Sequence, residues 1–201
     1  MDNAGLLRRF VGTFGAFDDL RACRDLVGPG DIRPLLVEPW DLASGFARWK
    51  PIMEQTPRSE LEQLYQSVPG SFPDLYEQLA LSYRWYDVDI GQLRLVTSLG
   101  PGLIGLQYSI TKDRGLFDVL TPAGYVQFGK GPDVDYDPVC FDFFRRRPDG
   151  DCPIVKFDHE EILQNKCLVE VGQIAPSFRE LVERAVHEGE RELASRSFPE
   201  V

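Results

Sequence analysis

The chain has 201 residues, of which 43% are hydrophobic and 11% aromatic, and this apolar share excludes a largely disordered protein. Its 32 Asp and Glu residues outnumber its 22 Lys and Arg residues, which gives a formal net charge of -10. Because a surface of that sign repels phosphate groups, nucleic acids and anionic membranes are excluded as preferred partners.

The first 55 residues are predicted to form an N-terminal extension that packs on the rest of the chain. A helical spacing predicts one helix over residues 17–27, which ends at Gly28-Pro29-Gly30. Three aromatic side chains follow in irregular chain, at Trp40, Phe46 and Trp49. Because exposing all three would be unfavourable, we expect them to hold the extension against the body.

Two short amphipathic helices are expected at the start of the body, which spans residues 56–201. Apolar side chains at helical spacing, with Pro57 in the first turn, predict the first over residues 56–68. Ser71 as an N-cap predicts the second over residues 71–83.

The middle of the body is expected to contain most of the strands. An alternating pattern over residues 93–98 predicts a half-buried strand, and residues 125–128 predict a second one. The stretch between them, residues 102–120, is expected to be partly helical. Residues 138–158 predict a β-hairpin around a Pro-Asp-Gly turn at residues 148–150.

A closing helix is expected after Pro176. Its apolar stripe consists of Phe178, Leu181, Val182, Ala185 and Val186. Helices, then strands, then a helix are typical of an α+β fold.

Neither a membrane segment nor a disulfide framework is expected. The longest uncharged run, residues 95–111, is broken by glycine, proline and polar residues. The first residues lack the pattern of a secretory signal, and the four cysteines lie far apart without a C-x-x-C pair. We therefore expect a cytoplasmic protein with free thiols.

One glycine motif raises the possibility of a nucleotide site. The segment GPGLIG at residues 100–105 matches G-x-G-x-x-G and follows a candidate strand. That strand alternates, however, whereas the buried parallel strand before a dinucleotide site is apolar throughout. A glycine-rich turn is the favoured interpretation, with no cofactor, and a nucleotide-binding enzyme using Gly100 to Gly105 is the least favoured alternative.

Two metal patterns fail on their spacing. His159 begins a segment like a zinc-protease helix, but Leu163 stands where the second histidine is required. Three aspartates, Asp133, Asp135 and Asp137, have the spacing of a calcium loop, but a proline stands at its glycine position. We expect no metal and no catalytic residues.

A concentration of acidic residues is the strongest candidate for a functional surface. Residues 133–161 hold nine acids and four bases, which is half of the negative excess. They could be turn-forming aspartates on a solvated rim, or a docking surface for a basic protein. The candidate partner-binding residues are Asp133, Asp135, Tyr136, Asp137, Asp149, Asp151 and Trp85.

Five short blocks of sequence carry a family resemblance. They are FPDLY at 72–76, GYVQFG at 124–129, DPVCFD at 137–142, CPIVKFDHE at 152–160 and IAPSFREL at 174–181. In this order they resemble the SUKH superfamily, which includes the fungal cell-wall synthesis regulator and many bacterial immunity proteins. The resemblance covers about residues 56–188, and it departs from the family where Tyr83-Arg84-Trp85-Tyr86 replaces a glycine-bearing turn.

The resemblance implies a SUKH-like α+β domain with a central, mostly antiparallel sheet flanked by helices and without catalytic residues. Bacterial members commonly bind and neutralise a toxin, and other members are scaffolds. The leading hypothesis is therefore a non-enzymatic immunity protein whose acidic surface binds a basic partner, such as a nuclease-like toxin. A regulatory or structural scaffold, with the aromatic extension as a second contact surface, is the alternative.

Overall fold

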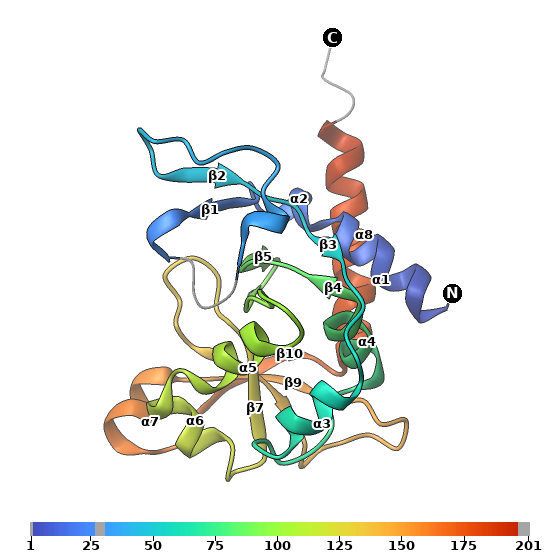
Figure 1. Cartoon of the computed structure of the whole chain (residues 1–201). Coiled ribbons are helices and arrows are strands. Elements are labelled where there is room, and N and C mark those ends of the chain that lie inside the picture. The colour runs from blue at the N-terminus through green and yellow to red at the C-terminus, as the bar shows by residue number, and fades with distance from the viewer. Residues whose placement is uncertain (1, 27–30, 197–201) are drawn as a thin grey trace.

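The computed structural model describes residues 2–26 and 31–196 and shows an α+β fold (Figure 1). Its main sheet has six strands in the order β10-β9-β8-β7-β6-β5, and every neighbouring pair is antiparallel. The strands are β5 (Val88–Ile90), β6 (Leu93–Leu95), β7 (Tyr125–Lys130), β8 (Pro138–Asp142), β9 (Ile154–Phe157) and β10 (Glu170–Ala175).

Two small sheets and a set of helices surround the main sheet. The small sheets pair β1 (Arg21–Cys23) with β2 (Phe46–Arg48), and β3 (Ile52–Met53) with β4 (Tyr83–Arg84). The α-helices are α1 (Asn3–Gly12), α2 (Phe14–Phe17), α3 (Ser59–Tyr65), α4 (Asp74–Ser82), α5 (Ile104–Thr111), α6 (Arg114–Leu120), α7 (His159–Asn165) and α8 (Phe178–Arg196). Two short 3-10 helices are η1 (Arg24–Leu26) and η2 (Arg33–Leu35).

An aromatic cluster joins the sheet to the helices at the centre of the core. The rings of Phe128 on β7 and Phe141 on β8 stack with centroids 4.1 Å apart. Tyr76 on α4 and Phe178 on α8 set their edges against Phe141 at 5.0 and 5.8 Å. All four side chains are buried, and such ring pairs contribute about 0.5–1.5 kcal/mol each beyond their apolar burial.

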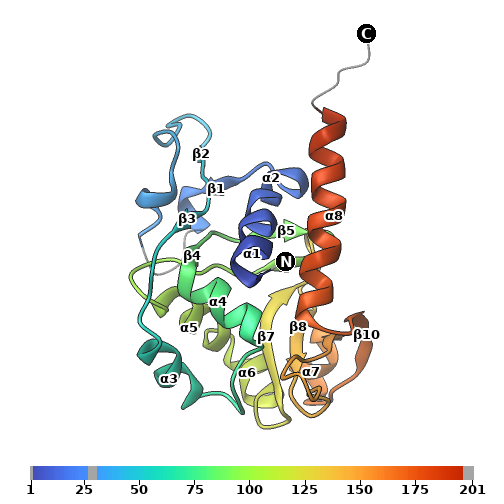
Figure 2. The same ribbon diagram turned by 90° about the vertical axis from the view of Figure 1, so that its right-hand side faces the viewer.

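The N-terminal extension shares the core of the body. Helix α1 lies beside α8, as Figure 2 shows, and also contacts α4. Its Leu6, Leu7 and Phe10 belong to the same buried cluster as the aromatic residues of the sheet. Trp49 is buried as well, whereas Trp40 is half-buried and Phe46 partly exposed.

The expected helix over residues 17–27 is wrong. Helix α2 ends at Phe17, and Leu20 adopts a positive φ of 49°, which is incompatible with continuing the helix. The backbone after it instead pairs with residues 46–48 as β1. Non-local pairing therefore overrides the local spacing, and the expected stop at residues 28–30 lies outside the described residues.

The other predicted elements are confirmed with shifted ends. Helices α3 and α4 stand where residues 56–68 and 71–83 predict them, but α4 begins at Asp74 with Pro73, not Ser71, at its N-cap. Strands β6 and β7, helices α5 and α6, the hairpin of β8 and β9, and helix α8 all occur in the expected segments. Within residues 2–26 and 31–196, no helix has the length and apolar composition needed to cross a membrane.

Candidate functional site

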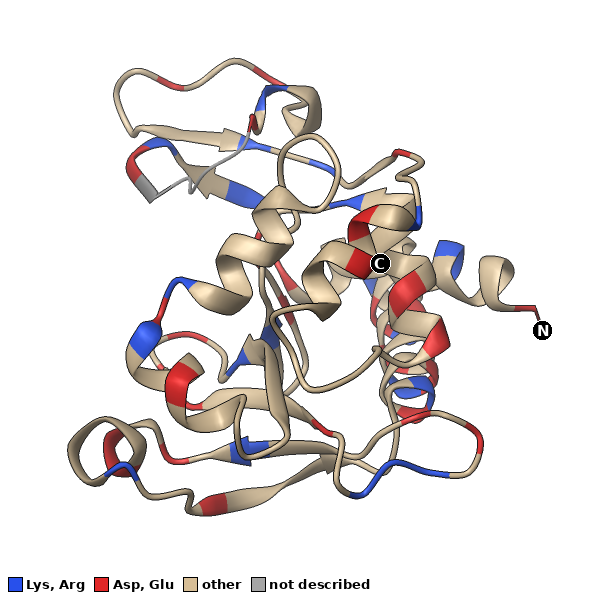
Figure 3. Cartoon of the chain, turned by 60° about the horizontal axis from the view of Figure 1, so that its bottom comes forward, with Lys and Arg blue, Asp and Glu red and all other residues tan. Residues whose placement is uncertain are grey.

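The predicted partner-binding residues lie at opposite ends of the β8–β9 hairpin. Asp133, Asp135, Tyr136 and Asp137 precede β8, whereas the two acids of residues 149–151 lie in the turn after it. A five-residue strand separates the two groups by about 17 Å. Acidic and basic residues are also interspersed over the ribbon in Figure 3. The candidate residues therefore do not form one patch.

At the turn end, the acids stabilise the start of α8. The carboxylate of Asp151 accepts the backbone N–H groups of Phe178 at 2.9 Å and Arg179 at 3.1 Å. It therefore acts as a cap on α8 from another part of the chain. Asp149 forms an exposed ion pair of 3.0 Å with Arg147. These two residues thus have structural partners at this end of the hairpin.

Trp85 does not belong to any surface, which corrects the prediction. Its side chain is 0% exposed, and its indole Nε1–H donates to the carbonyl of Val96 at 2.8 Å. The backbone of Trp85 pairs with Ser98, which draws the ring into the core. A partner could not reach Trp85 without unfolding this region.

At the other end, residues 131–137 form a tightly held loop, called here the 131–137 loop. Its ends are joined by a hydrogen bond of 3.0 Å from Gly131 N–H to the carbonyl of Asp137. One oxygen of Asp135 accepts the N–H of Asp137 at 2.9 Å, and the other accepts Nζ of Lys156 at 2.8 Å. A Cβ on Gly131 would collide with the Asp135 side chain, so the loop requires glycine there.

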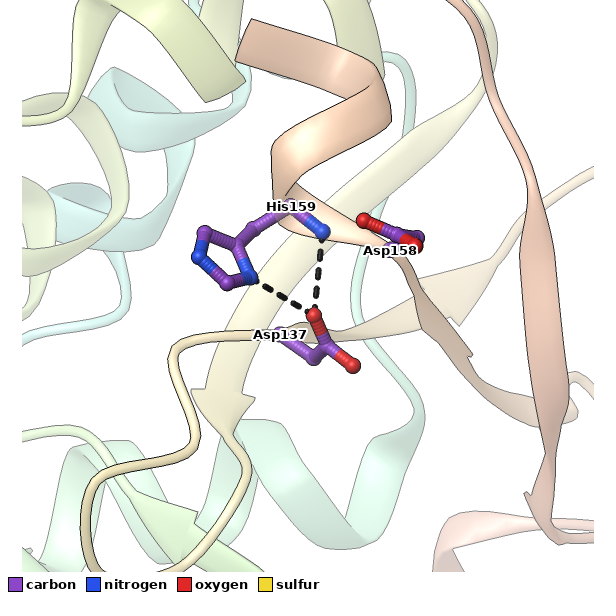
Figure 4. A group of neighbouring side chains, drawn as sticks. All are labelled: Asp137, Asp158 and His159. Atoms are coloured by element: carbon purple, nitrogen blue, oxygen red, sulfur yellow. Dashed lines mark hydrogen bonds and ion pairs between the residues drawn. The ribbon is translucent and has the colours of Figure 1, made fainter.

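A second set of contacts fixes the loop to the start of α7 (Figure 4). Oδ1 of Asp137 accepts the backbone N–H of His159 at 3.0 Å and its ring Nδ1–H at 2.8 Å. Since a carboxylate only accepts, Nδ1 of His159 carries a proton in this contact. Burial alone would raise the pKa of Asp137, but the hydrogen bonds from His159 and the charge of Lys156 together lower it.

The same residues include the group that could hold a metal ion. Ligand atoms of Asp137, Asp158 and His159 lie within 4.8 Å of one another. Oδ1 of Asp158, however, caps α7 by accepting the N–H groups of Glu160 and Glu161 at 2.9 and 3.1 Å. The hydrogen bonds of these three residues connect the loop to α7, and they account for the positions of the three side chains without a metal ion.

The 131–137 loop presents two apolar side chains to solvent. Val134 is 82% exposed and Tyr136 is 58% exposed. The ring of Tyr136 lies 5.0 Å from Nζ of Lys130 and 6.1 Å from the ring of His159, so its inner side is supported. Asp133, next to Val134, is exposed and has a φ of 54°. The loop is thus ordered but outward-facing.

A cavity of about 400 Å³ lies behind the loop. It is called here the α5–α7 cavity. Its wall comes from the segments next to β5 and β6, from β7, from the helices α5, α6 and α7 with the turn between α5 and α6, and from Tyr136 of the 131–137 loop. The lining residues are Asp87, Val96, Ser109, Lys112, Asp113, Leu116, Gln127, Lys130, Tyr136, His159 and Leu163. A more open groove of about 730 Å³ toward the N-terminal extension shares Asp87, Lys130 and Tyr136 with it.

Sequence reasoning missed this cavity. Three of its polar groups, Asp87, Ser109 and Lys130, come from separate segments, and none of these three belongs to a motif. Only the fold brings them together.

The glycine motif at residues 100–105 has an internal explanation. Gly102 has a positive φ of 63°, and a Cβ there would collide with the Glu60 carboxylate. Glu60 accepts the N–H of Leu103 at 2.7 Å, at the start of α5. The position that a phosphate would take at this helix end is therefore filled by a carboxylate of the chain itself.

Comparisons with known proteins leave the family unassigned. No model of a known protein family matches the chain, and no curated protein is significantly similar to it. The resemblance to the SUKH superfamily therefore stays a prediction. The conclusion from geometry is an α+β fold that carries an ordered, outward-facing loop in front of a cavity.

Proposed function

We propose that the chain is a non-enzymatic protein-binding domain whose 131–137 loop docks a basic protein partner. The observation that carries this proposal is the exposure of Val134 and Tyr136 on a loop that hydrogen bonds hold at both ends. An exposed apolar pair on a disordered segment would need no explanation. On a fixed loop, the pair is a persistent apolar feature.

The rigidity of the loop favours binding. Asp135 and Asp137 hold its backbone through Lys156 and His159. A partner would therefore lose little free energy in ordering the loop, and the contact energy would appear as affinity. Tyrosine supplies a large contact area with few rotatable bonds and is enriched at interface positions that dominate binding energy.

Charge favours a basic partner. The protein has a net charge of -10, and exposed Asp133 and Glu160 lie on the loop and at the start of α7. Complementary charge accelerates association and selects among partners. Because Lys156 and His159 engage Asp135 and Asp137, the specific contact would come from the apolar pair and the steering from the remaining acids.

The partner class that we propose is a basic toxin, such as a nuclease-like toxin, which the chain neutralises by binding. This part of the proposal is supported by the sequence resemblance. A scaffold role for the N-terminal extension has weaker support, because Trp49 and the apolar face of α1 are buried in the core. Deleting residues 1–50 would expose that core and could not test the role.

The experiment begins with purification of the tagged chain from its native cell at low and at high salt. We expect a basic protein that co-purifies at low salt and is depleted at high salt. That protein is then produced separately, and its Kd for the chain is measured. Tyr136→Ala should weaken binding at least about 30-fold, which corresponds to about 2 kcal/mol at an interface hot spot.

The matched control is Phe144→Ala. Phe144 is a 75% exposed aromatic residue at the turn end of the same hairpin. We expect the Kd of the Phe144→Ala variant for the partner to stay within about twofold of the wild-type value. For a toxin, expression of the partner alone should arrest growth, and co-expression of the wild-type chain but not of Tyr136→Ala should restore it. Equal weakening by both variants, or a partner without basic character, would refute the proposal.

A further inference from the structure

We propose that the α5–α7 cavity binds a small zwitterion of the apolar α-amino acid class. The ammonium group of the ligand would contact Asp87, and its carboxylate would contact Lys130. The hydroxyl of Ser109 would form a hydrogen bond with one of these two groups. This site lies behind the 131–137 loop and shares Tyr136 with it, but its test uses no protein partner, so either proposal can fail without the other.

The first observation is an unsatisfied hydroxyl in the cavity wall. Ser109 is 4% exposed, and its Oγ has no hydrogen-bond partner among the residues that the structure describes. A buried hydroxyl without a partner is unfavourable, because it has lost its hydrogen bonds to water and gained none from the protein. A serine inside a helix usually bonds to the carbonyl one turn earlier, as Thr111 does with Gln107 at 2.9 Å. The structure gives Ser109 no such bond, and Ser109 is one of the residues that line the cavity.

The second observation is a pair of opposite charges that line one cavity without touching. One oxygen of Asp87 accepts the N–H of Thr97 at 2.7 Å, and within the described part of the chain neither Asp87 nor Lys130 forms an ion pair. Burial raises the pKa of Asp87 and lowers the pKa of Lys130. Among the described residues, both charged forms are therefore poorly solvated and lack an ion-pair partner, which a ligand could supply; Nζ of Lys130 lies 5.0 Å from the ring of Tyr136.

The charges of the wall select a zwitterion over a simple anion. Lys112 and Lys130 are balanced by Asp87 and Asp113, so the lysines and carboxylates of the lining carry no excess of either sign. An anion could use the lysines but would meet the Asp87 carboxylate. A molecule with an ammonium and a carboxylate on the same carbon atom offers a partner of opposite charge to both Asp87 and Lys130.

The rest of the cavity wall is apolar, and it determines which kind of amino-acid side chain the ligand would carry. Val96, Leu116 and Leu163 line the cavity between the polar groups. A volume of about 400 Å³ is near the lower end of small-molecule sites, which span about 300–1,000 Å³. Leucine and phenylalanine therefore match the site better than glycine, which has no side chain to cover this wall.

The test uses the whole chain and a matched set of probes. L-Leucine and L-phenylalanine are compared with glycine, with 3-methylbutylamine, which lacks the carboxylate of leucine, and with 4-methylpentanoate, which lacks its amino group. We expect leucine or phenylalanine to bind by calorimetry and to raise Tm by about 3–5 °C at ten times Kd. The other three probes should bind at least about tenfold more weakly.

Two charge variants locate the site. Asp87→Asn keeps an acceptor for the Thr97 N–H, and Lys130→Met keeps the apolar stem. Each should weaken leucine binding at least about tenfold. The control, Asp118→Asn, removes an exposed carboxylate of α6 outside the cavity wall and should leave Kd unchanged.

A measurement on the wild-type chain covers the case in which a variant does not fold. In NMR spectra, leucine should shift the signals of Ser109 and the Lys130 side chain, but not those of Lys50, an exposed lysine outside the cavity wall. Binding of 4-methylpentanoate as tight as that of leucine would overturn the proposal, as would the absence of binding by every probe.

Discussion

The two ends of the β8–β9 hairpin have similar compositions but differ in what their side chains contact. Each end has aspartates and an exposed aromatic residue. At the turn end, Asp151 caps α8, and the ring of Phe144 covers Gly124 and lies 6.3 Å from the ring of Tyr125. At the loop end, the aspartates hold a loop that turns Val134 and Tyr136 outward. Similar compositions therefore have different structural roles at the two ends, and the hydrogen-bond partners of the acids distinguish these roles.

The largest effect on stability is expected at the turn end, from Asp151→Ala. This change removes the acceptor of two N–H groups at the start of α8. We expect a loss of about 2 kcal/mol in the free energy of unfolding, measured by urea denaturation. Asp149→Ala, which removes an exposed ion pair with Arg147 and an exposed hydrogen bond from the Asp151 N–H, should cost less than about 1 kcal/mol. Equal losses of stability in the two variants would contradict the different roles assigned to Asp151 and Asp149.

At the loop end, Gly131→Ala should cost about 1–2 kcal/mol. The added Cβ would displace the Asp135 side chain and break its contacts with Lys156 and Asp137. The same change should loosen the loop and weaken partner binding, in contrast to Asp151→Ala, which should affect stability alone. Faster hydrogen exchange of the Asp137 amide would report the loosening. An unchanged exchange rate would show that these contacts do not hold the loop.

The pH dependence of stability should contain a contribution from Asp137. The pKa of this group is lowered in the folded state, so its contribution is present above its unfolded pKa of about 3.9 and is lost as pH falls through the folded pKa. Asp137→Asn should cost about 1 kcal/mol at pH 7 and make the acid loss of stability shallower. Urea denaturation at several pH values measures both. A steeper acid loss in the variant would contradict this sign.

The smallest expected effect concerns steering by charge. Asp133 is exposed on the loop, and Asp133→Lys should slow association with a basic partner about two- to threefold at low salt and have less effect at high salt. Stopped-flow measurements at two salt concentrations test this change. Asp133 is better suited to the test than Asp151, because a lysine in place of Asp151 would also remove the cap of α8.

Local patterns predicted much of the fold but little of the site. The apolar stripe of α8 and the alternation of the β8–β9 hairpin identified both elements, because each pattern repeats over the whole element. The N-terminal helix α1 and strand β10 were not predicted. The helix expected over residues 17–27 was wrong because pairing with β2 decides that segment.

The site was harder to predict, because it depends on which side of the chain each residue faces. Trp85 and Tyr136 are both aromatic and both near acids in sequence, yet one is buried and the other is exposed. The α5–α7 cavity combines Asp87, Ser109 and Lys130, and nothing in their local sequence indicates that they share a wall.

Hydrogen exchange of the wild-type chain with and without its purified partner tests the role of the 131–137 loop most directly. We expect new protection in residues 131–137 and at the start of α7, with none in the turn between β8 and β9. Protection centred on the turn, with the loop unaffected, would contradict the proposed docking surface.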